Sequence, residues 1–200
     1  MELQRALNQI SEIHAQVLKQ ELFQGYRAAT MATTGVIAVL AACVQSTILV
    51  PVDTAQFAYY WIAIAVLCAL ICAIDLTFSS RNCRRTHLQR YTVPVVAQFL
   101  PAIAVGALVT WGLLSFDGRA QALLPGLWSL IYCLGIFSSR PYLPRAVGWV
   151  GSYYLLAGVY LLLVCGQMGS PSPWCMGVTF GLGQVSLAWV LHLNLERMES

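Results

Sequence analysis

The sequence predicts an all-α, polytopic membrane protein with six transmembrane helices and an N-terminal cytoplasmic amphipathic helix. Apolar residues make up 58% of the chain and charged residues only 10%, whereas a soluble domain carries about 25% charged residues. The apolar residues gather into runs of about 20, the length that crosses the hydrocarbon core of a bilayer as a helix. The alternating segments of about ten residues that are typical of transmembrane strands are absent.

Six such runs follow one another along the chain with short connections. They lie at residues 29–50, 57–79, 92–115, 122–138, 147–166 and 175–194. Because no connection is long enough for a separate soluble domain, residues 27–200 are expected to form one transmembrane bundle. Residues 1–26 are assigned to the cytoplasmic helix in front of it.

The segment before the first run has the periodicity of a helix. Leu3, Leu7, Ile10, His14 and Val17 recur at alternating spacings of four and three residues, which places them on one stripe. The opposite face carries both acidic and basic side chains, so it lacks the basic bias of a helix attracted to anionic lipid. One interpretation is a helix packed flat under the bundle. The other is a helix that docks a second copy or a partner, with His14 as a pH-sensitive element.

The basic residues predict the orientation of the bundle. If the N-terminus lies in the cytoplasm, ten of the eleven Lys and Arg residues lie on the cytoplasmic side and only Arg119 lies outside. Both termini are therefore expected in the cytoplasm. The first run begins too late for a secretory signal peptide and lacks a small-residue cleavage site. The net charge of +3 follows from this topology and does not indicate a nucleic-acid surface.

The ends of the runs carry residues that are typical of membrane interfaces. Four tryptophans fall toward the outer ends and two toward the inner ends: Trp61, Trp111, Trp128 and Trp174, then Trp149 and Trp189. The tetrapeptide Phe-Ser-Ser-Arg ends two outer-to-inner runs, at Phe78–Arg81 and Phe137–Arg140. An interfacial aromatic ring, hydroxyls for the last free carbonyls and an arginine that reaches the interface explain this recurrence as helix-end chemistry. We favour that interpretation over a true internal repeat or a ligand motif.

Three polar side chains within the runs are candidate ligand-binding residues, since polar groups at membrane depth are costly. The rise per residue puts Asp75 and Gln98 at similar depth in the cytoplasmic half and Gln184 nearer the middle. Together with Arg140 or Arg145 they could form a small cavity that opens inward and binds a polar or amphipathic ligand. Alternatively, Asp75 pairs with a loop arginine and the glutamines bond across helices.

Two further features bear on helix geometry. Pro94 and Pro101 flank Gln98, and proline frees a backbone carbonyl and bends a helix. Gly177 and Gly181 form a Gly-x-x-x-Gly pair, which permits close approach of another helix. A contact of this glycine pair and of the lead-segment stripe with a second copy or a partner membrane protein is a hypothesis, beside the interpretation of the lead segment as a helix packed flat under the bundle.

Cysteine spacing indicates no metal centre. Cys165 and Cys175 flank the last external loop and could form a disulfide if that side is oxidising, and the other five cysteines are expected to fill apolar space. Cys68, Cys72 and Asp75 share one helix face, but neither a Cys-x-x-Cys pair nor a histidine accompanies them. No histidine lies in the middle of a run, where it could ligate haem. We therefore expect neither metal nor cofactor.

Patterns of catalytic residues are also scarce. No histidine occurs on the external side to activate a serine, and no glycine-rich phosphate loop is present. Phe116–Ala120 (FDGRA) is superficially like the acidic motif of lipid-headgroup transferases but lacks the further aspartates that would hold metal. An enzyme is less favoured than a protein without catalytic activity.

Several strings in the chain are similar to those of a known group of proteins. FQGYRAAT, PGLW, SRPYLPRAVGWV, SPWCMGVTFGLGQ and NLER resemble an uncharacterised family of small bacterial six-helix inner-membrane proteins, over most of the chain. The resemblance implies a stand-alone protein of a bacterial inner membrane. That family has no assigned activity, so no functional residue is carried over.

These observations favour a non-catalytic membrane scaffold, sensor or accessory subunit that works through helix–helix contacts. The competing hypothesis is a small oligomeric transporter or ligand-binding membrane protein, with Asp75, Gln98 and Gln184 around an inward-facing polar cavity. The two hypotheses differ in whether the polar residues converge on a hydrated cavity or pair between helices.

Overall fold

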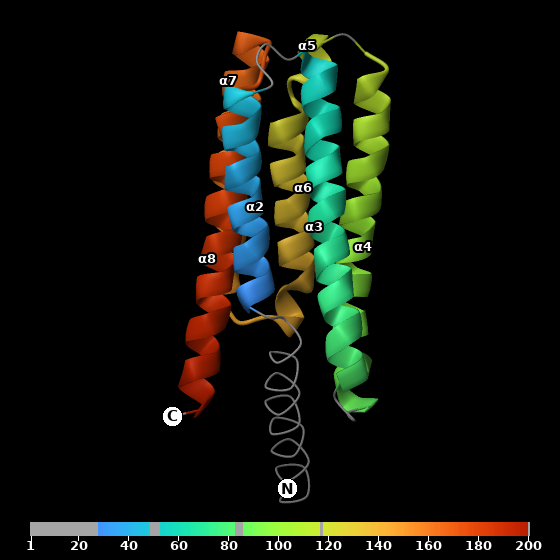
Figure 1. The fold of residues 1–200 in the computed structure, drawn as a ribbon, viewed down its shortest axis with the longest axis vertical. Coiled ribbons are helices and arrows are strands. Elements are labelled where there is room, and N and C mark those ends of the chain that lie inside the picture. The colour runs from blue at the N-terminus through green and yellow to red at the C-terminus, as the bar shows by residue number, and fades with distance from the viewer. Residues whose placement is uncertain (1–27, 49–52, 83–85, 117, 200) are drawn as a thin grey trace, which may run out of the picture.

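The computed structural model describes residues 28–48, 53–82, 86–116 and 118–199. Within these ranges the protein is a bundle of long helices that stand side by side (Figure 1). Six helical segments are long and apolar enough to cross a membrane, which confirms the predicted fold class. The lead-segment residues Leu3, Leu7, Ile10, His14 and Val17 lie outside the described residues.

The helices lie close to the predicted runs. In chain order they are α2 (Ala28–Thr47), α3 (Thr54–Asn82), α4 (Thr86–Leu114), α5 (Gly118–Gln121), α6 (Leu124–Ser139), the 3₁₀ turn η1 (Arg140–Tyr142), α7 (Val147–Met168) and α8 (Pro173–Glu199). Several helices extend beyond the apolar runs, because hydropathy marks only the part of a helix that lies in lipid while backbone hydrogen bonding continues through its polar end. The short α5 and η1 were not predicted.

Both copies of Phe-Ser-Ser-Arg lie at helix ends, as the sequence predicted. The copy at Phe78–Arg81 lies in the last turns of α3, and the copy at Phe137–Arg140 spans the end of α6. The hydroxyls of the second copy do not bond the last carbonyls of their own helix, however. Ser138 Oγ donates to the backbone carbonyl of Gln98 on α4, at 3.2 Å, so this helix end also joins two helices.

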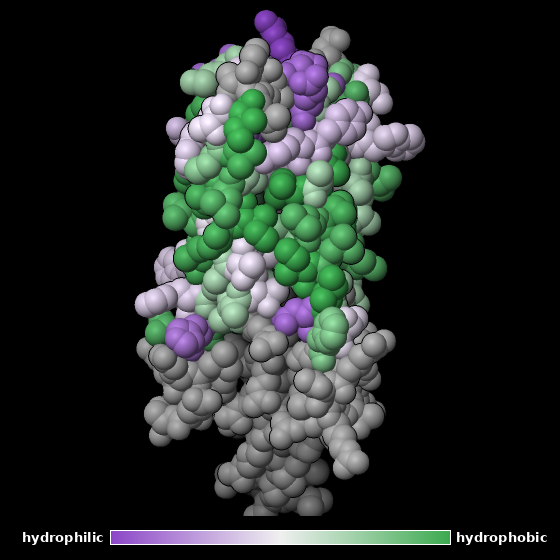
Figure 2. All heavy atoms as spheres, viewed as in Figure 1, coloured by the Kyte–Doolittle hydropathy of each residue, from purple (hydrophilic) through white to green (hydrophobic). Residues whose placement is uncertain are grey.

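Successive spans alternate in direction, so the start of α2 and the end of α8 lie at the same face of the bundle (Figure 1). This face, which we call the basic face, also collects the helix ends and the turn that carry Arg81, Arg90, Arg140, Arg145 and Arg197. Between the two ends, hydrophobic residues form a broad band across the middle of the molecule (Figure 2). A multi-pass membrane protein is therefore the arrangement that the described residues fit.

Four helices form the core of the bundle and two lie outside it. The most extensive packing is of α2 on α8 and of α6 on α7, while α4 packs on α6 and α3 makes a smaller contact with α2. Buried residues make up 39–50% of the apolar segments that contain α2, α6, α7 and α8, but only 6% of those in α3 and α4. We call the first four the core helices and the other two the peripheral helices.

Glycines mark the places where the core helices meet most closely. A Cβ atom on Gly181 would lie 2.5 Å from Val39, and one on Gly177 would overlap Ala42, both on α2. The close approach that the Gly-x-x-x-Gly pair indicates therefore occurs within the chain. Because α2 covers these two glycines, they are not available for the contact with a second copy or partner that the sequence suggested.

Candidate functional site

Asp75 links a peripheral helix to the core. Its Oδ2 atom accepts a hydrogen bond of 2.7 Å from Thr30 Oγ1, in the first turn of α2. One turn earlier on α3, Cys72 packs against the cluster of buried residues near the basic face. The carboxylate of Asp75, half-buried, thus fixes α3 against α2 near the basic face.

Gln184 lies at the centre of the core helices. It is 9% exposed, and its Nε2 atom donates a hydrogen bond of 2.6 Å to the hydroxyl oxygen of Tyr132 on α6. The ring of Tyr132 contacts those of Phe99, Tyr154 and Phe180, with centroids 5.3, 4.8 and 5.8 Å away. One amide therefore bonds into an aromatic cluster built from α4, α6, α7 and α8.

Gln98 lies on α4, which continues as a helix through both Pro94 and Pro101. The side chain of Gln98 is half-buried, and its neighbour Phe99 is the residue that reaches the core, where its ring fills the space above Gly135. The described contacts therefore attach Asp75 to α2 and Gln184 to α6, while Gln98 bonds α6 through its backbone carbonyl.

The two candidate arginines lie at the surface of the basic face. Arg140, in η1, and Arg145, just before α7, are both exposed. The guanidinium group of Arg140 lies alongside Gly148, at the start of α7, where a Cβ atom would be 3.5 Å from it. These side chains border the basic end of the bundle.

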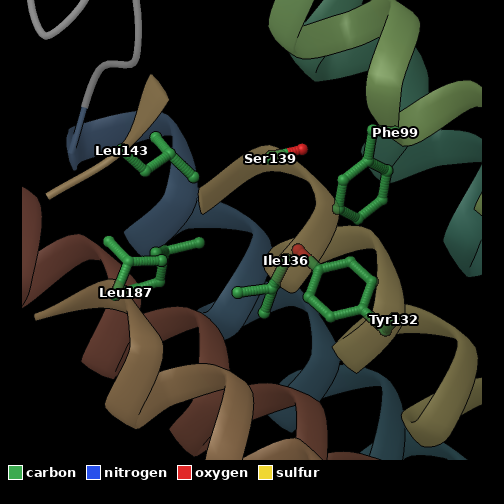
Figure 3. A pocket seen from close by; sticks show the side chains of 7 residues that line it. Phe99, Tyr132, Ile136, Ser139, Leu143 and Leu187 are labelled. Atoms are coloured by element: carbon green, nitrogen blue, oxygen red, sulfur yellow. The ribbon is translucent and has the colours of Figure 1, made fainter. Parts of the chain in front are cut away.

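A small cavity lies among side chains of α4, α6, α7 and α8, and its lining includes none of the predicted site residues (Figure 3). Its volume is about 20 Å³, and it is lined by Phe99, Tyr132, Ile136, Ser139, Leu143, Val147 and Leu187. Ser139 is 1% exposed, and its Oγ atom has no hydrogen-bond partner among the described residues. A cavity of this size holds about one water molecule.

Sequence reasoning missed two polar pairs near the opposite face. Trp61 Nε1 on α3 donates to Gln45 Oε1 on α2, and Trp128 Nε1 on α6 donates to Thr110 Oγ1 on α4, both at 2.8 Å. From the sequence we expected both tryptophans to be interfacial anchors, yet Trp61 is only 3% exposed. The sequence did contain a signal for these pairs. Gln45 lies near the outer end of the run before Trp61, and Thr110 lies near the outer end of the run before Trp128.

The remaining tryptophans fit the interfacial role. Trp111, Trp149, Trp174 and Trp189 are 45–80% exposed.

Among the described residues, no group of three or more His, Cys, Asp and Glu side chains lies close enough together to hold a metal ion.

The thiols of Cys165 and Cys175 lie near each other at the face opposite the basic face. Their sulfur atoms are 3.9 Å apart, and both cysteines are free.

Comparison of the chain with known proteins identifies no relative, since no family model, curated protein or solved structure matches it.

Proposed function

We propose that this chain is a non-catalytic integral membrane protein that acts as a scaffold, sensor or accessory subunit through helix–helix contacts. The observation that carries the proposal is the use made of polar groups within the membrane. Four bonds between side chains each join two spans: Thr30 to Asp75, Trp61 to Gln45, Trp128 to Thr110, and Gln184 to Tyr132. Such bonds between helices are a common use of polar residues in a bilayer.

The size of the cavity supports the same proposal. Pockets for small molecules usually have volumes of about 300–1,000 Å³, whereas the cavity lined by Phe99 and Tyr132 measures about 20 Å³. A protein that binds a ligand there would have to open the aromatic cluster around Tyr132.

The peripheral helices supply the surface for membrane lipid and for a partner or second copy. Large apolar side chains point outward along both: Tyr59, Val66, Leu70, Ile74 and Phe78 on α3, and Leu100, Ile103, Leu108 and Trp111 on α4. Because the other faces of these helices make few buried contacts, docking on them would leave the core helices unchanged. The lead segment, by its sequence pattern, is the second candidate contact.

For the location we propose a bacterial inner membrane with the basic face in the cytoplasm. The arginines at that face support the orientation under the positive-inside rule, and both termini then lie in the cytoplasm. The family resemblance supports the bacterial membrane.

One observation favours the transporter or ligand-binding alternative. Gln184 Oε1 is buried and, like Ser139 Oγ, has no hydrogen-bond partner among the described residues. Buried polar atoms without partners are costly. Ser139 lines the cavity, and Gln184 is bonded to Tyr132, which lines it too. A conformation that opens the cavity to a polar ligand would give them partners.

The Asp75→Asn variant distinguishes the scaffold proposal from the transporter alternative. The amide oxygen can still accept the hydrogen bond from Thr30, so a scaffold should lose only a little stability and keep its oligomeric state. A transporter that uses the carboxylate should lose ligand-dependent flux in reconstituted vesicles. Asp53→Asn is the matched control, because Asp53 is exposed at the opposite face and neither proposal gives it a role.

A further inference from the structure

The hairpin of α7 and α8 brings two thiols together at the face opposite the basic face. Cys165 lies in the last turn of α7 and is 1% exposed, while Cys175 lies in the first turn of α8 and is half-buried. Their sulfur atoms are 3.9 Å apart. Since a disulfide bond measures about 2.05 Å, about 2 Å separates this arrangement from a bridge.

The backbone of the hairpin holds the two cysteines in place. Gly169 ends α7 in the left-handed conformation, with φ of 71°, and its N–H donates to the carbonyl of Cys165 at 2.9 Å. The N–H of Cys175 donates to the carbonyl of Ser172, also at 2.9 Å. Pro173 begins α8 with its φ angle already restricted. Both cysteines therefore sit beside a hydrogen-bonded cap at the end of a short turn.

We propose that Cys165 and Cys175 form a reversible dithiol–disulfide site whose co-reactant is a thiol–disulfide oxidant, either a small disulfide such as oxidised glutathione or a protein disulfide. The thiolate of Cys175, the more exposed of the two, attacks one sulfur of the oxidant and releases the other as a thiolate. The thiolate of Cys165 then attacks the Cys175 sulfur of this mixed disulfide and releases the second thiolate. The two cysteines lose two protons and two electrons in total, and the oxidant becomes two thiols.

The bridge would tie the outer ends of two core helices. It would close a ring between residues ten positions apart and restrict the unfolded chain at the turn between α7 and α8. In cells its oxidation rests on the proposed orientation, which places this turn on the side of the membrane where disulfides persist.

Purified full-length protein, reduced and then equilibrated with glutathione redox buffers, tests the site apart from its orientation. After alkylation of free thiols and digestion, we expect the peptide that contains both cysteines to be about 2 Da lighter than its reduced form, with neither cysteine alkylated. Cys175→Ser and Cys165→Ser should abolish the bridge, whereas Cys43→Ser on α2 should leave it unchanged. The bridged protein should also have a higher Tm than the reduced protein, and Cys175→Ser should remove that difference.

A different result would overturn the proposal. If both thiols are alkylated, or if Cys175 stops at a mixed disulfide with glutathione, the pair is not a dithiol–disulfide site. Membranes quenched with acid and alkylated directly then report the state in the cell. A bridge there supports both the site and the orientation, while reduced thiols there, with a bridge in glutathione, support the site and contradict the orientation.

Discussion

α3 and α7 are both long apolar helices, yet they have different places in the bundle. In α7, 39% of the apolar segment is buried, against 6% in α3. The sequence difference that accompanies this is glycine, of which α7 has four and α3 none. Gly151 and Gly158 of α7 each meet α6 at a point where a Cβ atom would come within 3.1 Å of a neighbouring side chain. Between these two helices, glycines at close contacts, and not a greater apolar content, accompany the deeper burial.

The physical reason lies in the solvent. Lipid tails are as apolar as leucine, so burial of apolar surface does not by itself draw two spans together. Close packing does, because dispersion contacts accumulate when backbones approach each other. Polar bonds then fix the peripheral helices at a few points, such as Trp61 to Gln45 and Asp75 to Thr30 on α3.

The largest contrast is expected between two tyrosines. Tyr154 on α7 is 0% exposed and Tyr59 on α3 is 60% exposed. Tyr154→Ala should lower the free energy of unfolding by about 3 kcal/mol, since it leaves a cavity among packed rings, whereas Tyr59→Ala should change it by less than about 0.5 kcal/mol. Unfolding of both variants in mixed micelles, followed by circular dichroism, measures the difference. Equal losses would contradict the distinction between core and peripheral helices.

A second contrast uses added volume in place of removed volume. A methyl group on Gly183 would overlap the ring of Tyr154, while a methyl on Gly112 of α4 would meet nothing within 4 Å. We expect Gly183→Ala to cost about 2 kcal/mol through overpacking, and Gly112→Ala to raise stability by up to about 1 kcal/mol through helix propensity. The same unfolding assay applies, and a neutral Gly183→Ala would mean that α7 and α8 are less tightly packed than described.

The attachment of α3 can be weakened at one bond. Trp61→Phe leaves the buried amide of Gln45 without its described donor and should cost about 1 kcal/mol. Adding Gln45→Leu to Trp61→Phe should recover part of that loss, because the unpaired amide is removed with the bond. A double-mutant cycle on these two positions reports the coupling, and additive losses would show that the bond does not hold α3 in place.

The smallest effects are expected at buried hydroxyls without a described partner. Tyr154 Oη and Ser139 Oγ are such groups, so Tyr154→Phe and Ser139→Ala should leave stability unchanged or raise it by up to about 1 kcal/mol. Tyr132→Phe is the control, because it removes the acceptor of the Gln184 amide and should be destabilising. A clear loss at Ser139, which lines the cavity, would indicate that water or a ligand occupies it, and a clear loss at Tyr154 would show that its hydroxyl has a bonding partner.

Hydropathy predicted the spans and their order but not the rotation of each helix about its axis. Every face of a span is apolar, so the pattern does not say which side meets a neighbour. For this reason Trp61 and Trp111 looked alike in the sequence, although Trp61 is buried against α2 and Trp111 is exposed. The same limit applies to the candidate site: the depth of Gln184 in the membrane could be estimated, but its bond to Tyr132 depends on how α6 and α8 face each other.

The central claim is that polar groups in the membrane join helices and do not bind a ligand. Native mass spectrometry of the full-length protein, released from mild detergent, tests it most directly. We predict a protein that carries no stoichiometric ligand or metal other than lipid, with an assembly state that changes when residues 1–24 are removed. A non-lipid ligand bound in fixed ratio, and lost in Asp75→Asn but not in Asp53→Asn, would contradict the claim.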